Sequence, residues 1–276
     1  MAPVPQLGAY LPQLVAFALQ ARSDYQAGTL ADWPTFIRRV RAFYTPAMME
    51  TIEKVAPGWN HMATFADQQT LIHVTSVFVA LYDHPEYAHI STTFKHLMEW
   101  IVLFHDIAKE AVRGKHDYVH GFRSAALAGK ALPTLGFPIN QPDTGGLEDW
   151  AQLTHNAIVF HEGHEEYIQD NRQLPAITAG IDRLFSDQSP ASLVIKPILL
   201  HLSIDSDPDY PTVAPLTEAE IQRFVVGDVL PLLRLLTLID NDSWNLFDAE
   251  QREVQRQKTH GAFQKIAQQV HTGEIE

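Results

Sequence analysis

An all-helical fold is predicted because apolar residues recur at helical spacing along most of the chain, while few segments alternate as a strand does. Segments rich in Pro, Gly and Asn separate the helical runs, and neither an internal repeat nor a low-complexity block interrupts them. With 276 residues and 46% hydrophobic content, the chain can build a large core. One all-α domain with extra N-terminal helices is therefore expected.

Residues 1–66 are expected to form a helical extension that packs on the core. Apolar residues recur at helical spacing from Leu11 to Arg22 and again from Trp33 to Phe43. A turn containing Gly28 and Pro34 separates the two runs. Periodicity does not distinguish helices that cover the core from helices that form a homodimer surface, so both uses stay open.

Residues 67–250 are expected to form the main helical domain. Its first helix, from Gln68 to Tyr82, has a broad apolar surface. Ser91 or Thr92 is suited to cap the next helix, which is expected to run to about Val112.

Further helical segments follow in the same domain, and we expect them at 121–135, 147–161, 174–185 and 191–203. A loop rich in Pro, Gly and Asn over 133–146 separates the first two. An acidic segment with two prolines, over 205–211, interrupts the chain after the last.

The end of the chain carries clear helix signals. Thr217 and Glu220 have the spacing of a capping box, in which the side chain of each residue accepts a hydrogen bond from the backbone N–H of the other. Pro231 suits the first turn of a helix that carries Leu232 to Phe247. Residues 251–276 are polar and are expected to form a C-terminal helix or tail.

Charge and composition exclude several classes of function. A formal net charge of -13 disfavours a protein that binds duplex nucleic acid by neutralising its phosphates. With no cysteine, the chain has no disulfide, no zinc-thiolate site and no thiol nucleophile, so any metal must bind His, Asp and Glu. No run of about 18 apolar residues and no signal peptide is recognisable, so we expect a cytoplasmic protein without membrane attachment.

The most informative feature is the pair His105-Asp106, at the end of the apolar run that contains Trp100 and Phe104. A charged pair at such a position is costly unless it has a partner, and a divalent cation is a partner that both side chains can bind. The sequence therefore directs the search for a metal site to this helix.

Histidines are concentrated around this pair, since ten of the 14 lie between His73 and His164. A lone histidine on an amphipathic helix is usually a satisfied or partly exposed side chain rather than a ligand. That ordinary interpretation is given to the following residues: His84, His89, His96, His116, His164, His201, His260 and His271.

Two further residues combine with the pair. His73 lies in the helix before it, and Asp240 lies in the late apolar helix that also holds Asp242. The order His, His-Asp, Asp on successive helices resembles the HD-domain superfamily of metal-dependent phosphohydrolases, over roughly residues 68–247. Asp240 shares its helical face with apolar residues and is the preferred last ligand, with Asp242 as the competing choice.

This resemblance implies an HD-like helical bundle with a metal held by His73, His105, Asp106 and Asp240. Two more histidines, His120 and His161, would complete a second metal site; His155 is a weaker alternative to His161 because it cannot share a helical face with it. The ligand set suits Mn, Fe, Co, Ni, Zn or Mg, and one or two ions.

The implied activity is hydrolysis of a phosphate ester by a metal-activated water. Asp106 would orient the water, while Lys109 and Arg123, each one turn beyond a histidine, would bind the phosphate together with His120. Arg113 and Lys115 would add an electrostatic rim.

A nucleotide or a small phosphorylated metabolite is the expected substrate, because the chain lacks the Gly-Tyr-Pro extension of the cyclic-dinucleotide branch. Two alternatives stay open. The same scaffold serves HD-type di-iron oxygenases, which need the full set of extra histidines, and a non-catalytic HD module that binds or regulates would contain little metal.

Overall fold

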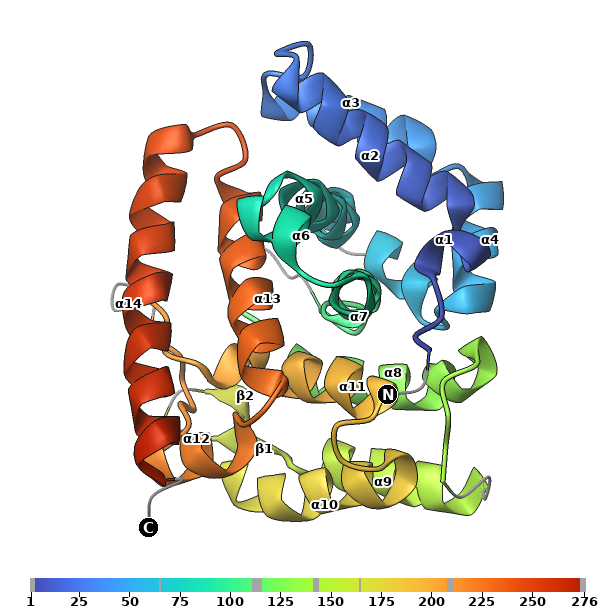
Figure 1. The fold of residues 1–276 in the computed structure, drawn as a ribbon. Coiled ribbons are helices and arrows are strands. Elements are labelled where there is room, and N and C mark those ends of the chain that lie inside the picture. Colours follow the sequence, from blue (N-terminus) through green and yellow to red (C-terminus); the bar gives the residue numbers. More distant parts are fainter. Residues whose placement is uncertain are drawn as a thin grey trace.

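The computed structural model describes residues 3–64, 66–110, 116–140, 144–163, 165–207 and 211–273 (Figure 1). It is 72% helix and 3% strand, which confirms the all-α class. The rim residues Arg113 and Lys115 lie outside the described residues, as do His164 and the side chain of His271.

Four helices form the N-terminal layer, and two of them were expected from periodicity. In Figure 1 this layer lies in blue over α5. Helix α3 begins where the Asp32 side chain accepts a hydrogen bond from the Thr35 N–H at 2.7 Å, and α4 begins at Thr45 in the same way. The four are α1 (Leu7–Tyr10), α2 (Pro12–Gln26), α3 (Trp33–Phe43) and α4 (Pro46–Val55).

The central helix α5 (Gln69–Asp83) is buried on every side from Thr70 to Tyr82, because α2, α3, α7 and α13 all pack against it. Two short 3₁₀ turns, η1 (Trp59–Thr64) and η2 (Ala66–Gln68), lead into it. The short helix α6 (Pro85–His89) follows it.

Helix α7 (Thr92–Phe104) begins as expected, with Ser91 accepting a hydrogen bond from the Phe94 N–H, but it ends well before Val112. Residues 105–108 form a turn, in which the Lys109 N–H donates to the Asp106 carbonyl at 2.9 Å. The prediction of a continuous helix was wrong because apolar periodicity continues through this turn. His105-Asp106 therefore lies at a helix end rather than within a helix.

The remaining helices lie in the second half of the chain, and most of them lie close to the ranges expected from the sequence. Thr217 and Glu220 form the expected capping box, Pro231 lies in the first turn of α13, and the polar C-terminal segment is the long helix α14. The bounds are α8 (His120–Ala131), η3 (Leu132–Leu135), α9 (Thr144–Asn156), η4 (Asn171–Gln173), α10 (Leu174–Phe185), α11 (Pro190–Leu200), η5 (His201–Ser203), α12 (Glu218–Phe224), α13 (Val229–Trp244) and α14 (Ala249–Gly273).

A β-hairpin replaces the end of the helix expected over 147–161. Strand β1 (Ile158–His161) pairs antiparallel with β2 (Glu166–Gln169), in register from Ile158 opposite Gln169 to His161 opposite Glu166. The run Ile158-Val-Phe is β-branched and aromatic, which favours a strand, and a short apolar run cannot be assigned by periodicity alone. The expected helix was therefore wrong in its last turn.

Buried apolar side chains from the N-terminal layer, the central helices and α14 belong to one continuous core, which runs from Val4 to Val270. No helix in the described ranges is both long enough and apolar enough to cross a membrane. Helices α5, α7, α8, α11 and α13 pack against one another at the centre of this core.

Candidate metal centre

Six His and Asp side chains converge at the centre of the fold, from α5, α8 and α13 and from the segments that directly follow α7 and α11, and they form two groups. We call His73, His105 and Asp240 the outer group and Asp106, His120 and His201 the inner group. Within each group the candidate ligand atoms lie within 4.8 Å of one another. Five of the six residues are buried, and Asp240 is partly exposed.

Helix ends fix the orientation of three of these imidazoles. The Nδ1 atoms of His105 and His201 lie 2.9 and 2.7 Å from the carbonyl oxygens of Val102 and Ile198, each three residues earlier. Carbonyls in the last turn of a helix lack an intrahelical partner, so they can accept these bonds. A carbonyl only accepts, so Nδ1 carries the proton in both rings and Nε2 presents its lone pair to the centre.

His120, at the first residue of α8, follows the same rule. Its Nδ1 lies 2.6 Å from the Asp117 carbonyl oxygen, which again assigns the proton to Nδ1. In metal sites a histidine ligand usually donates its other N–H to such an acceptor, which fixes the ring and its tautomer.

His73, in the middle of α5, uses a side chain instead. Its Nδ1 lies 3.2 Å from the Ser243 hydroxyl, and that hydroxyl donates its own proton to the Asp240 carbonyl at 2.7 Å. The hydroxyl must therefore accept from the His73 Nδ1–H. All four imidazoles thus present a lone pair on Nε2.

The outer group leaves three buried polar atoms without a hydrogen-bonding partner among the described residues: His73 Nε2, His105 Nε2 and Asp240 Oδ1. His73 Nε2 lies 2.8 Å from Asp240 Oδ1, and His105 Nε2 lies 3.9 Å from the same oxygen. Two lone pairs and a carboxylate oxygen that converge without a proton donor are unfavourable when buried. A cation between them removes that cost, so the residues fit a bound metal ion.

Asp106 joins the two groups, because its two carboxylate oxygens face different ways. Oδ1 lies 2.9 Å from His120 Nε2, in the inner group. Oδ2 lies 3.4 Å from His73 Nε2 and 2.7 Å from the Lys109 ammonium. Burial alone would raise the pKa of Asp106, but Lys109, His105 and His120 hold it well below the usual value. An ionised carboxylate whose oxygens face both groups could bind a cation in each of them.

In the inner group, two Nε2 atoms from distant parts of the chain face each other. His120 Nε2 and His201 Nε2 are 3.2 Å apart, and His201 Nε2 is 3.8 Å from Asp106 Oδ1. Because both rings carry their proton on Nδ1, the contact requires a cation between them, either a metal ion or a second proton on one ring. The inner group therefore also fits a metal ion.

Gly121 makes this approach of α8 and α11 possible. A Cβ atom at this position would lie 3.0 Å from the Ile198 carbonyl oxygen and 3.3 Å from His201 Cε1. That carbonyl is the acceptor that orients His201. A side chain at Gly121 would therefore move the ring that faces His120.

Burial keeps two of the imidazoles neutral, which is the form that binds metal. It lowers the pKa of His105, against the opposing charges of Asp106 and Asp240. It also lowers the pKa of His201 to about 3, and His120 and His105 add to that shift. Burial would raise the pKa of Asp240, but His73 and His105 lower it overall.

The centre reaches solvent on the side of the outer group. The side chains of Asp240 and Lys109 are 26% and 22% exposed, whereas those of the other ligands are almost fully buried. Trp244 flanks this opening. Its ring stacks on the His73 ring with 4.2 Å between the two centroids, and the Lys109 ammonium lies 5.7 Å from the centroid of the Trp244 ring. Asp106 raises the pKa of Lys109 although burial acts against it, so the ammonium stays charged.

The last predicted ligand is Asp240, since Asp242 faces elsewhere. The Asp242 carboxylate is buried against the guanidinium of Arg256, with Nε lying 3.0 and 2.9 Å from its two oxygens. The two aspartates are on the same helix, but only Asp240 reaches the outer group.

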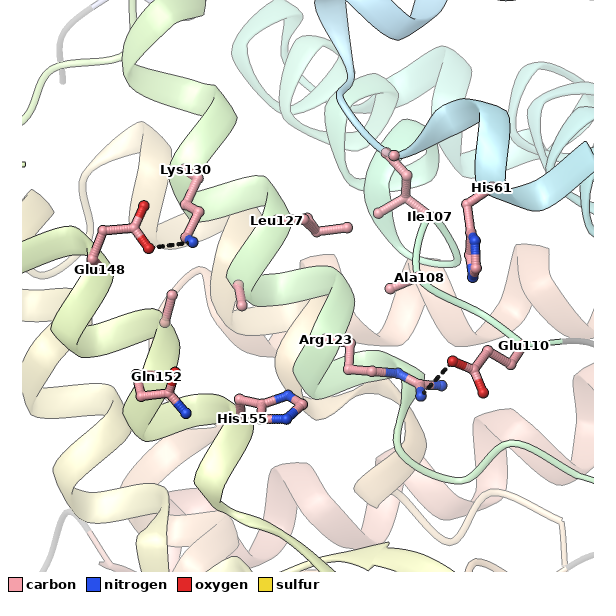
Figure 2. A pocket seen from close by; sticks show the side chains of 13 residues that line it. His61, Ile107, Ala108, Glu110, Arg123, Leu127, Lys130, Glu148, Gln152 and His155 are labelled. Atoms are coloured by element: carbon pink, nitrogen blue, oxygen red, sulfur yellow. Dashed lines mark hydrogen bonds and ion pairs between the residues drawn. The ribbon is translucent and has the colours of Figure 1, made fainter.

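Arg123 lies in a separate pocket of about 500 Å³ between α8 and α9, shown in Figure 2. Its guanidinium pairs with Glu110 at 3.2 Å and with Asp117, so two carboxylates already neutralise it. None of the six candidate ligands lines this pocket, whereas His155 does. Phosphate binding by Arg123 stays a prediction that this position does not favour.

His161 is not brought to the centre. It lies on the exposed strand β1 and belongs to neither group of candidate ligands. The residue that faces His120 is His201, which the sequence interpretation treated as an ordinary satisfied or partly exposed histidine. A signal was present: His201 ends the apolar helix α11 in the same way that His105 ends α7.

Comparison of the chain with protein-family models, with characterised proteins and with solved structures found no match. The centre described above could hold a metal ion; its candidate ligands are His73, His105, Asp106, His120, His201 and Asp240.

Proposed function

We propose that this chain is a metal-dependent phosphohydrolase of the HD type, which hydrolyses a phosphate ester of a nucleotide or a small phosphorylated metabolite. The observation that carries the proposal is the convergence of four Nε2 lone pairs and two carboxylates beside the Lys109 ammonium. A buried set of this composition is unfavourable without cations, and a cationic centre with an ammonium at its mouth attracts an anionic substrate.

Two divalent ions fit the proposal better than one. The outer group would hold the first ion and the inner group the second, with one oxygen of Asp106 directed to each. The mixed nitrogen and oxygen ligands are compatible with Mn, Fe, Co, Ni, Zn or Mg. When bound, such ions polarise a phosphoryl oxygen and acidify a water.

The residues of the chain have three tasks in this reaction. The four imidazoles direct their Nε2 atoms to the centre, because Val102, Ile198, Asp117 and Ser243 hold their Nδ1 protons. Asp106, whose two oxygens face the two groups, would orient the attacking water. Lys109 offsets the negative charge that the phosphoryl group carries into the site.

A panel of phosphate esters, assayed with each of the six metals, tests the proposal. We expect hydrolysis with at least one metal, and a rise in KM of at least about tenfold in Lys109→Gln, because a charge-assisted contact contributes more than 1 kcal/mol. Lys54→Gln is the matched control, since Lys54 is exposed and pairs with Glu50 in the same helix. Absence of hydrolysis with every metal would rule the proposal out.

A di-iron oxygenase is the second candidate, since that chemistry needs the additional histidines that His120 and His201 supply. Iron content and substrate-dependent oxygen consumption separate the two. Hydrolysis that proceeds equally with Mn or Mg, and without oxygen, excludes the oxygenase. A purified chain that takes up almost no metal, even when supplemented, would instead be a non-catalytic module.

A further inference from the structure

We propose that a second pocket, between the N-terminal layer and the outer group, binds a flat heteroaromatic group of the substrate. This inference rests on the proposed function, because it assigns the part of the phosphate ester that does not react. It also assigns the N-terminal layer a role in substrate specificity. From the sequence, this layer was expected only to cover the core or to form a homodimer surface.

The pocket has a volume of about 490 Å³, which is within the range of sites for small molecules. Three parts of the chain wall it: α3, the start of α5 with the turn before it, and the end of α13. Figure 1 shows α3 and α13 on different sides of α5. His73, a ligand of the outer group, is itself one of the lining residues.

Trp244 connects this pocket to the metal centre. Its ring lines the pocket, stacks on His73 at an interplanar angle of 17° and lies near the Lys109 ammonium. The side chain is 46% exposed although it is large and aromatic. A ligand that contacts Trp244 is thus adjacent to the group that would bind a phosphoryl oxygen, so one molecule can occupy both places.

The chemistry of the walls indicates what the ligand is. Trp33, Ile37 and Ile72 provide an apolar surface, to which a flat ring can stack or pack. At the rim, Arg41 and Gln69 offer N–H donors, and Asp67 and Gln69 offer acceptors. An alkyl chain would leave these polar groups unused, and a sugar phosphate would leave the apolar wall unused.

The rim has an unusual backbone. Asp67 and Gln68 are consecutive non-glycine residues with positive φ angles, 57° and 65°, and the Arg41 guanidinium donates to the Asp67 carbonyl at 2.9 Å. Such conformations are uncommon for side chains other than glycine and tend to gather at binding sites. Asp67, in this turn, and Gln69, directly after it, line the pocket together with the α3 residues Trp33, Ile37 and Arg41.

The pocket between α8 and α9 has a similar volume but a different character. Its cations, Arg123 and Lys130, are paired with Glu110 and Glu148, and none of the candidate ligands lines it (Figure 2). Of these two pockets, the one at Trp33 and Trp244 combines an aromatic wall with a candidate metal ligand. It is therefore the one that we assign to the substrate.

Calorimetric binding of adenosine and of ribose to the metal-loaded chain tests the assignment. Adenosine carries a flat heteroaromatic group and no phosphate, so its binding does not depend on hydrolysis. We expect adenosine to bind and ribose not to bind at millimolar concentration. Trp33→Ala should weaken adenosine binding about five- to 150-fold, the range that stacking on an aromatic side chain contributes.

Trp33 also packs against Phe36 and Phe247, so a second variant guards against misfolding. Ile37→Trp fills the pocket without removing an aromatic contact and should weaken adenosine binding to a similar extent. Phe160→Ala, which removes an exposed aromatic ring on β1, is the matched control and should bind adenosine as the native chain does.

Two results would overturn the assignment: no binding of adenosine to the native chain, or equal binding by the native chain and Ile37→Trp. Either can occur while phosphate esters are still hydrolysed, in which case only the pocket is wrong. Conversely, adenosine binding that depends on Trp33 and Ile37, in a chain that hydrolyses no phosphate ester, supports the pocket and contradicts the hydrolase.

Discussion

The outer and inner groups use similar side chains in different surroundings. The outer group borders a pocket and reaches solvent at Asp240. Its three candidate ligand atoms have no hydrogen-bonding partner among the described residues. The inner group is buried, and His120 Nε2 is already in contact with both Asp106 and His201. Under the proposed function, substrate would therefore enter on the outer side, and an ion in the inner group would serve mainly to fix Asp106 and His120.

Asp106→Ala tests whether the two groups form one centre, and we expect the largest effect. Removing the shared carboxylate should release both ions and lower kcat/KM by at least about 100-fold, because changing even an outer-shell partner of a metal ligand costs 10–100-fold. Metal analysis and hydrolysis of the best phosphate ester are the measurements. His105→Ala should lose the ion of the outer group and the activity with it; full activity in either variant would contradict a shared centre.

His201→Ala separates the inner group from the outer one. We expect the metal content to fall from two ions to one, because the inner group keeps only Asp106 and His120 as ligands, while the outer group is unchanged. His161→Ala is the control and should keep both ions, since His161 lies on the exposed hairpin. If His161→Ala lost an ion and His201→Ala did not, the assignment of the inner group would be wrong.

Ser243→Ala should affect the outer group alone. The His73 Nδ1–H would lose its acceptor, so the ring would be held less firmly and the metal affinity of the outer group should fall about 10–100-fold. Titration of the metal-free chain, followed by calorimetry, should show one weakened site and one unchanged site. Equal weakening of both sites would indicate that the hydroxyl supports the fold rather than His73.

Asp242→Asn should leave both groups intact and change only stability. The variant removes the charge of the ion pair with Arg256, so the free energy of unfolding should fall by roughly 1.5–3 kcal/mol, the contribution of a hydrogen bond to a charged group. Thermal unfolding measures this loss, and metal content provides the contrast with Asp240→Asn, which should lose the outer ion. A loss of metal in Asp242→Asn would mean that Asp242 also contributes to the outer group.

Local signals in the sequence were sufficient for much of the fold. Apolar periodicity placed most helices, and the capping residues Ser91 and Thr217 placed two helix starts. Periodicity failed where it is ambiguous: it did not detect the turn after Phe104, and it extended a helix through residues 158–161, which form a strand. In both places the backbone conformation depends on contacts with other parts of the chain, and a local sequence pattern carries no information about those contacts.

By itself, the sequence predicted His73, His105-Asp106 and Asp240 as candidate metal ligands, in that order on successive helices. Only the tertiary structure decided that His201, 81 residues from His120, faces it, and that Asp242 and Arg123 are paired with other charges. The physical reason is that a ligand is defined by where its lone pair points. That direction depends on a carbonyl at a helix end and on the packing of α8 against α11 at Gly121.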